Sequence, residues 1–145
     1  PERHERRRDV SVDWREAMDF PGANQMRHLK ALLTIYPWHE LEPDQSGRLI
    51  VHGNGEGDAF LPSAIARDGR FALIYLPDHM PVYVNTTTLS EQPVEASWFD
   101  PRSGVCSALG RCQGTFVEFR PPLNEAGPDY VLVLERDEEC IHRRG

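Results

Sequence analysis

The segment 98–104, which reads Trp-Phe-Asp-Pro-Arg-Ser-Gly, constrains the fold of this chain more than any other stretch. It follows residues 94–99, in which apolar Val, Ala and Trp alternate with Glu, Ser and Phe, the period-two pattern of a β-strand. Asp100 and Pro101 suit the first two positions of a type I turn, and Gly104 can take the left-handed conformation that closes a longer hairpin loop. A strand that ends in this way belongs to an antiparallel meander and not to a β-α-β crossover. No catalytic motif accompanies the segment.

Strand and turn patterns dominate the sequence after about residue 47. The Asp-Gly pair within residues 67–70 lies between two apolar runs, which is the favoured sequence of a type I′ hairpin turn. The segments 71–76 and 130–134 are apolar on both faces, so we expect them to be central strands. Short strands at regular intervals predict a mainly β chain, an antiparallel β-sandwich over about residues 48–136. The predicted strands are 48–52, 60–67, 71–76, 81–85, 93–99, 115–119 and 129–135.

The pattern before residue 47 is helical. Asp13 with Glu16 three residues later forms a capping box for a short helix. A second helix is predicted over residues 23–36, packed against the sandwich, and residues 38–45 form an extended linker because prolines disfavour helix in the residues before them. The apolar face of this helix must be covered by other parts of the protein. That face consists of Met26, Leu29, Leu33 and Tyr36, with Leu32 beside them.

The amino-acid composition of the chain limits the classes of molecule that it can bind. The 145 residues carry a formal net charge of -7, which argues against nucleic acids and anionic membranes as partners, since both attract basic surfaces. No apolar run approaches the roughly 18 residues that span a bilayer. The first eight residues contain no initiator Met and no apolar signal-peptide core, so we expect the chain to be a piece of a longer protein.

The three cysteines leave at least one thiol free or paired between chains. Cys106 and Cys112 face each other if residues 109–110 form a hairpin turn, with Cys140 left over near the tail. Three reduced thiols are the favoured interpretation, because three cysteines are not the framework of a secreted disulfide protein. Their spacing does not form a zinc site.

Motifs for metal binding and nucleophilic catalysis are weak or absent in the sequence. The segment 53–58 offers oxygen side chains at alternate positions but has Ile65 where a calcium loop needs a bidentate Glu. No His-Glu-x-x-His or Gly-x-Ser-x-Gly motif occurs. Among the histidines, we expect His28 to be solvated and His39 to be buried, while Asp44 suits a turn better than a catalytic role. We therefore predict no metal site, no cofactor and no catalytic residue.

Aromatic side chains are the remaining candidates for ligand binding. Trp98, Tyr75 and Tyr83 lie on predicted strands, where a ring can stack on a sugar or a proline-rich ligand. The alternative for Trp98 is a place in the sandwich core, which is favoured because Val94 and Ala96 are apolar on the same face.

Eight short motifs occur in order along residues 13–135 and together resemble the C-terminal region of the apiosidase-like bacterial glycoside hydrolases, the family labelled "putative collagen-binding domain of a collagenase". The motifs are Asp13-Trp14-Arg15; Phe20-Pro21-Gly22-Ala23 with Gln25, Met26 and Leu29; Pro37-Trp38; Pro43-Asp44-Gln45; Tyr75 with Pro77; Trp98-Phe99-Asp100-Pro101-Arg102 with Gly104; Phe119 with Pro121-Pro122; and Asp129-Tyr130-Val131-Leu132-Val133-Leu134.

This resemblance implies a division of labour in which a (β/α)₈ barrel carries catalysis and a β-sandwich packs behind it. Residues 1–46 then correspond to the end of a truncated barrel domain, 47–136 to the sandwich and 137–145 to a polar tail. The barrel strands that bear catalytic carboxylates are missing, so no catalytic residue can be transferred to this chain.

The implied function is that of a non-catalytic accessory domain of a glycoside hydrolase-like protein, stabilising its barrel and contacting polymer. One alternative is a genuine collagen- or polysaccharide-binding module. The other is a fragment that contributes residues to the active site of the intact parent, a glycoside hydrolase or a collagenase.

Overall fold

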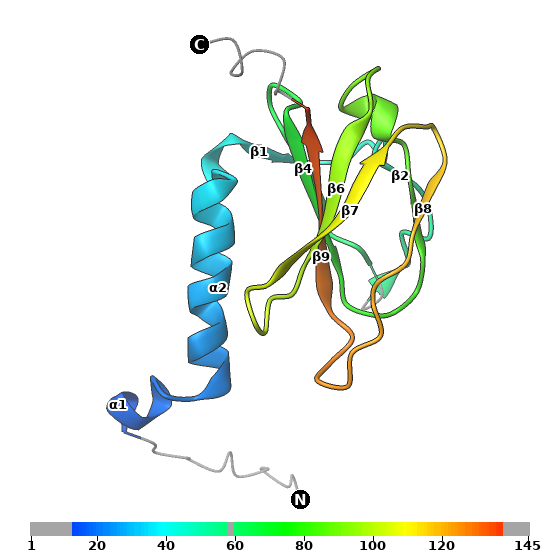
Figure 1. Ribbon diagram of the computed structural model, residues 1–145. Coiled ribbons are helices and arrows are strands. Elements are labelled where there is room, and N and C mark those ends of the chain that lie inside the picture. Colours follow the sequence, from blue (N-terminus) through cyan, green and yellow to red (C-terminus); the bar gives the residue numbers. More distant parts are fainter. Residues whose placement is uncertain (1–12, 58–59, 138–145) are drawn as a thin grey trace, which may run out of the picture.

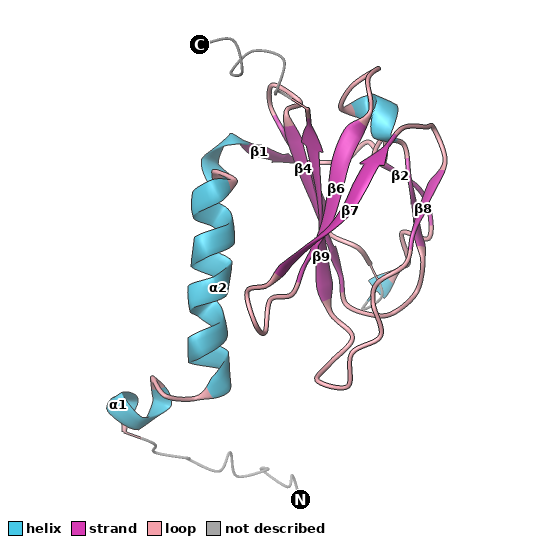
Figure 2. Ribbon diagram, viewed as in Figure 1, coloured by secondary structure: helices cyan, strands magenta, loops and turns pink. Residues whose placement is uncertain are grey.

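The computed structural model describes residues 13–57 and 60–137, which fold mainly into β-strands (Figure 1). Within them, two helices precede nine strands, and Figure 2 shows how the helices and strands are separated in space. The helices are α1 (Trp14–Ala17) and α2 (Pro21–Ile35). The strands are β1 (Leu41–Pro43), β2 (Ile50–His52), β3 (Ser63–Ala66), β4 (Phe71–Leu76), β5 (Val82–Val84), β6 (Val94–Phe99), β7 (Cys106–Cys112), β8 (Val117–Phe119) and β9 (Tyr130–Arg136).

The strands form two antiparallel sheets, which confirms the predicted mainly β fold. The larger sheet has the strand order β1-β3-β4-β9-β6-β7, and the smaller sheet has the order β2-β5-β8. Each strand pairing found in the described residues is antiparallel. The smaller sheet covers one face of the larger sheet, and α2 stands beside the opposite face (Figure 1).

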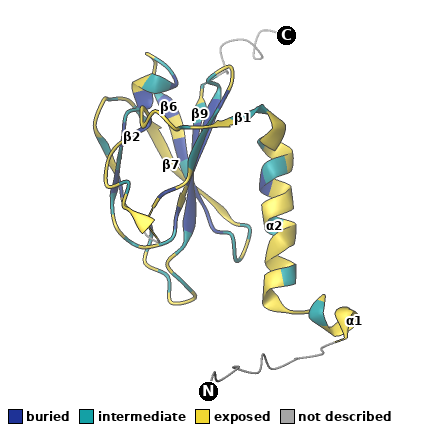
Figure 3. Cartoon of the chain, turned by 180° about the vertical axis from the view of Figure 1, so that it is seen from behind, coloured by how far each residue is buried: buried dark blue, intermediate teal, exposed yellow. Residues whose placement is uncertain are grey.

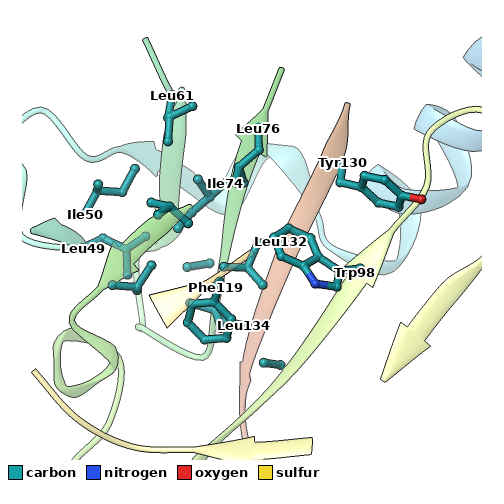
Figure 4. Packing of buried hydrophobic residues seen from close by; sticks show 14 of the residues in the cluster. Leu49, Ile50, Leu61, Ile74, Leu76, Trp98, Phe119, Tyr130, Leu132 and Leu134 are labelled. Carbon is teal, nitrogen blue, oxygen red and sulfur yellow. The ribbon is translucent and has the colours of Figure 1, made fainter. Parts of the chain in front are cut away.

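Alternate residues of the central strands β4 and β9 enter two different cores. Ile74 and Leu132 point toward the smaller sheet, where they pack with Trp98 and Phe119 (Figure 4). Leu73 and Val133 point the other way, into a second cluster that contains Leu32 of α2. Each fully buried large apolar side chain stabilises the fold by about 1.5–3 kcal/mol. The two cores explain why these strands are apolar on both faces and confirm the prediction that they are central.

The hairpin loop predicted after Trp98 is present. The Asp100 N–H donates to the Val105 carbonyl at 2.9 Å, and the Gly104 N–H donates to the Asp100 carbonyl at 2.8 Å. Gly104 has a φ of 74°, the left-handed conformation expected from the sequence. The loop joins β6 to β7, which are adjacent antiparallel strands.

The Asp-Gly turn also joins two strands, β3 and β4, but its type differs from the prediction. The Gly69 N–H donates to the Ala66 carbonyl at 2.7 Å, and Gly69 has a φ of 71°. A type I′ turn needs two residues with positive φ, and Asp68 does not have one. The turn is therefore not type I′; Gly69 alone supplies the left-handed residue.

Two strands were not predicted. Residues 38–45, expected to be an extended linker, contain a 3-10 turn (Trp38–Glu40) and the edge strand β1, which pairs with β3. Strand β7 occupies residues that we interpreted as a hairpin around residues 109–110. Its register with β6 shifts between Ala96 and Ser97, so that Leu109 is an extra residue in a β-bulge next to Gly110. The glycine that suggested a turn instead allows this bulge.

The position of Cys106 and Cys112 on β7 shows that they do not form a disulfide. Cys106 and Cys112 lie at opposite ends of β7 and are both free. Six residues of strand separate their Cα atoms by about 20 Å, whereas a disulfide needs them within about 7 Å. The hairpin pairing considered from the sequence is therefore wrong, and Cys140 lies outside the described residues.

Candidate functional site

An open groove of about 840 Å³ lies between α2 and the outer face of the six-stranded sheet. Its walls are mainly apolar, with side chains of the helix on one side and of β4 and β9 on the other. The apolar and aromatic side chains that line it include Met26, Leu29, Leu33, Leu73, Tyr75 and Val131. Figure 3 shows that most of α2 is exposed, with burial restricted to a few positions.

The groove exists because α2 touches the sheet with only part of its apolar face. Leu32 is buried in the second core, and Leu33 and Tyr36 pack against the same core. Met26, in contrast, is 60% exposed and Leu29 is 39% exposed. The prediction that this face must be covered therefore holds for the end of the helix, whereas its beginning faces the groove.

Tyr36 fixes the end of α2 to the sheet. Its ring centroid lies 5.3 Å from that of Phe71 at the start of β4. Burial and the neighbouring Glu135 carboxylate raise the pKa of Tyr36 well above its ordinary value. Pro37 follows directly and is outside the helix, since a helix usually ends before a proline.

The middle of α2 contacts the β6–β7 loop through His28. Pro21 occupies the first turn of the helix, where its missing N–H is not needed, and the helix therefore begins two residues earlier than predicted. Two turns further along, His28 is half-buried against Gly104, whereas we had expected it to be solvated. His39, predicted to be buried, has a side chain that is 65% exposed.

A cluster of charged side chains supports one end of the groove. The Arg102 guanidinium donates to Asp100 and to Asp129, each at 2.9 Å, and its carbon lies 5.0 Å from the centre of the Tyr130 ring. Asp129 lines the groove beside Tyr75. Burial and the Asp129 charge raise the pKa of Tyr75, and Arg102 partly offsets that effect. The cluster holds the β6–β7 loop to the start of β9.

The structure separates the three aromatic residues proposed as ligand contacts. Trp98 is 2% exposed and lies in the core between the sheets, edge-on to Tyr130, as the alternative interpretation expected. Tyr75 faces the groove. Tyr83 lies on the smaller sheet, stacked with Phe116. The three therefore do not form one site. Phe116, which was not predicted as a ligand contact, stacks on Tyr83.

Other polar candidates have structural roles. Asp44 accepts hydrogen bonds from the backbone N–H groups of Arg48 (3.3 Å) and Leu49 (2.8 Å), as expected of a turn residue. In the suspected calcium loop, Asp58 lies outside the described residues, and the backbone carbonyl of Asn54 accepts a hydrogen bond from the backbone N–H of Leu61. Within residues 13–57 and 60–137, no three His, Cys, Asp or Glu side chains are grouped so as to hold a metal ion. In the same part of the chain, no helix has the length and apolarity needed to cross a membrane.

The chain is similar in structure to glycoside hydrolases. One solved structure, described as a glycoside hydrolase, superposes with a TM-score of 0.72 at 26% identity over 86% of this chain and 27% of its own. A second, a glycoside hydrolase family 5 protein from Bacteroides vulgatus ATCC 8482, has the same TM-score and identity over 86% of this chain and 26% of its own. The chain thus spans about a quarter of the length of these enzymes. The region from β1 to β9 makes up about two thirds of the chain. Since the matches cover 86% of the chain, they must also include part of the helical segment that precedes β1.

A comparison with curated proteins finds no match. A family model described as "Putative collagen-binding domain of a collagenase" matches residues 43–135, which begin at the end of β1 and stop within β9. This match and the glycoside hydrolase neighbours confirm the resemblance drawn from the sequence motifs. Because the match covers more than half of its residues, the chain belongs to the family of the putative collagen-binding domain of a collagenase.

Proposed function

We propose that this chain is a non-catalytic accessory domain of a glycoside hydrolase-like protein, and that the catalytic domain packs against the groove beside α2. The observation that carries the proposal is the uneven burial of one helix face. Leu32 is buried by the sheet, while Met26 and Leu29 on the adjoining turns remain exposed along an apolar groove. Apolar patches of this kind on a folded domain mark interaction surfaces.

The size relationship to the similar structures supports this assignment. The matched glycoside hydrolases are about four times as long as the region that resembles this chain. Their match covers 86% of this chain, more than the strands occupy, and therefore includes part of the helical segment. An apolar groove between α2 and the sheet gives the remainder of such a protein a surface on which to pack.

The proposal includes the domain division drawn from the sequence. Residues 1–46 are the end of the catalytic barrel domain, residues 47–136 are the accessory sandwich, and residues 137–145 are a polar tail. Strand β1 lies within the first of these ranges but already pairs with β3 in the six-stranded sheet, so the chain enters the sandwich shortly before residue 46. In this arrangement α2 lies between barrel and sandwich and contributes apolar contacts to both.

Two substitutions on α2 test the interface. Met26→Lys places a charge in the groove, and Ile35→Lys places one at a position that is 69% exposed and outside the groove. In the isolated chain both variants should change the free energy of unfolding by less than about 0.5 kcal/mol, as exposed substitutions usually do. In the intact parent, Met26→Lys should lower the melting temperature of the joined domains and Ile35→Lys should not.

The outcome that would contradict the interface is an equal effect of the two substitutions in the parent. The non-catalytic assignment has its own test. The purified chain should release no product from aryl glycosides or from a collagen-like peptide. Turnover that disappears on one substitution without loss of folding would show that the chain itself is an enzyme.

A further inference from the structure

We infer that the outer face of the smaller sheet is a binding platform for a sugar ring of a neutral polysaccharide, built around Phe116 and Tyr83. This inference goes beyond the accessory role and does not depend on the groove beside α2. It concerns the opposite side of the sandwich, where the strands β2, β5 and β8 expose one face.

The register of the smaller sheet places three side chains in one row. His52 of β2 is paired with Tyr83 of β5, and Tyr83 is paired with Glu118 of β8. Val82 and Val84, on either side of Tyr83, are fully buried in the core. Because neighbouring strand residues point to opposite faces, the Tyr83 side chain points outward.

An exposed aromatic stack stands on this row. The rings of Tyr83 and Phe116 are stacked with centroids 4.7 Å apart and an interplanar angle of 22°, and the His52 ring lies 5.4 Å from Tyr83. Phe116 is 61% exposed although Tyr83 lies against it. The stack thus holds the Phe116 ring in a fixed orientation while leaving much of it open to solvent.

Polar side chains lie beside the stack, and hydrogen bonds hold them in place. The Tyr83 hydroxyl donates to Glu118 Oε2 at 2.9 Å, and Arg120 Nη2 donates to Glu118 Oε1 at 3.1 Å. The hydrogen bond to Glu118 raises the pKa of Tyr83. Carboxylate and guanidinium groups beside an apolar ring offer acceptors and donors together.

This combination matches the chemistry of a sugar. A pyranose ring presents C–H groups on its face, which pack on an aromatic ring, and hydroxyl groups at its edge, which hydrogen-bond to carboxylate and guanidinium groups. Glu118 and Arg120 neutralise each other, and the chain carries a net charge of -7, so a neutral glycan fits better than an anionic one. The three strands span about 10 Å, which suits a short stretch of sugar rings better than the side of a collagen rod.

Binding of the full chain to insoluble cellulose, mannan and xylan, measured by sedimentation, tests the platform. We expect retention on at least one of the three. Phe116→Ser should weaken that binding by about tenfold or more, equivalent to about 1.4 kcal/mol. Tyr83→Phe keeps the stack and removes the hydroxyl, and should weaken it to a smaller extent. The matched control is Leu123→Ser, because Leu123 is an apolar residue that is 87% exposed and follows the end of β8 by four residues.

Two results would overturn the inference. They are the absence of binding to all three polysaccharides, whether or not the chain binds collagen, and binding that Phe116→Ser leaves unchanged in a variant with the melting temperature of the unsubstituted chain. Since Phe116 is not in either core cluster, its substitution should leave folding intact. Neither of these results bears on the Met26→Lys test, so the two proposals fail separately.

Discussion

The imidazole of His28 lies directly against Gly104, across the contact between α2 and the β6–β7 loop. A methyl group added to Gly104 would come within 2.4 Å of His28 Nδ1 and 3.0 Å of two ring carbons. The glycine thus has two functions: it takes a positive φ in the hairpin loop, and it leaves room for a side chain of the helix. The contact links the middle of α2 to the β6–β7 loop, and Pro101 of the same loop lines the groove.

Gly104→Ala should lower the free energy of unfolding through both effects. The left-handed conformation alone costs an alanine about 1–2 kcal/mol, and displacement of the His28 ring adds to that. Urea denaturation of Gly104→Ala with and without His28→Ala separates the two. The substitution should cost less when His28 is already alanine. Equal costs in the two backgrounds would show that the ring and the loop are not in contact.

Asp44→Ala should destabilise the chain by about 1–3 kcal/mol, because it leaves the backbone N–H groups of Arg48 and Leu49 without their acceptor. Asp44→Asn retains one side-chain oxygen and should cost less. The control is Asp68→Ala, which removes an acceptor from the exposed N–H of Arg70 and should change stability little. Urea denaturation measures all three, and a loss at Asp68 as large as that at Asp44 would contradict the assignment of Asp44 as the principal turn residue.

Asp100 should make the stability of the chain depend on acidic pH. Burial by itself raises the pKa of Asp100, but hydrogen bonds from Arg102 and Ser103 and the Arg102 charge outweigh it, so the net pKa is lowered. A carboxyl with a lowered pKa in the folded state stabilises the fold above its ordinary pKa of about 3.9 and loses that contribution as the pH falls through the folded value.

The measurement is the free energy of unfolding between pH 6 and 2 for the chain and for Asp100→Asn. Asparagine does not titrate, so the variant should be less stable at pH 6 and should lose less stability on acidification. The exposed residue Asp19 supplies the comparison for the substitution itself, as Asp19→Asn makes the same chemical change on the exposed surface. Parallel curves for the chain and Asp100→Asn would rule out the proposed contribution.

Cys106 should react with iodoacetamide before Cys112 does. The Cys106 side chain is exposed at the start of β7, whereas Cys112 is half-buried and burial raises its pKa. The thiolate is the reactive form, so both differences favour Cys106. Peptide mapping by mass spectrometry after short exposure at pH 8 gives the order. Faster labelling of Cys112 would contradict the placement of these residues on the strand.

The sequence predicted those parts of the fold that depend on local signals. The turn at Asp100–Pro101 and the two-sided apolar strands could be recognised because one residue pattern determines each of them. Strand β7 could not, because each of its first six residues is exposed and its place in the sheet comes from backbone pairing with β6. Strand β1 was missed since Pro43 and charged neighbours resemble a linker.

The candidate surfaces were harder to predict than the fold. Met26 and Leu29 were recognised as part of an apolar face, but which half of that face the sheet covers depends on where α2 docks. Phe116 stands alone in the sequence, and only the register of β8 against β5 brings it onto Tyr83. Such relationships join segments that are more than thirty residues apart.

The bulge at Leu109 has a consequence for association between copies of the chain. Strand β7 is one edge of the six-stranded sheet, and an unbroken edge is a template on which a further strand can add. The extra residue interrupts the even spacing of the backbone groups along that edge and increases its twist. At the other edge, Pro43 in β1 has no N–H to offer. The sheet therefore ends on both sides in strands that discourage edge-to-edge aggregation.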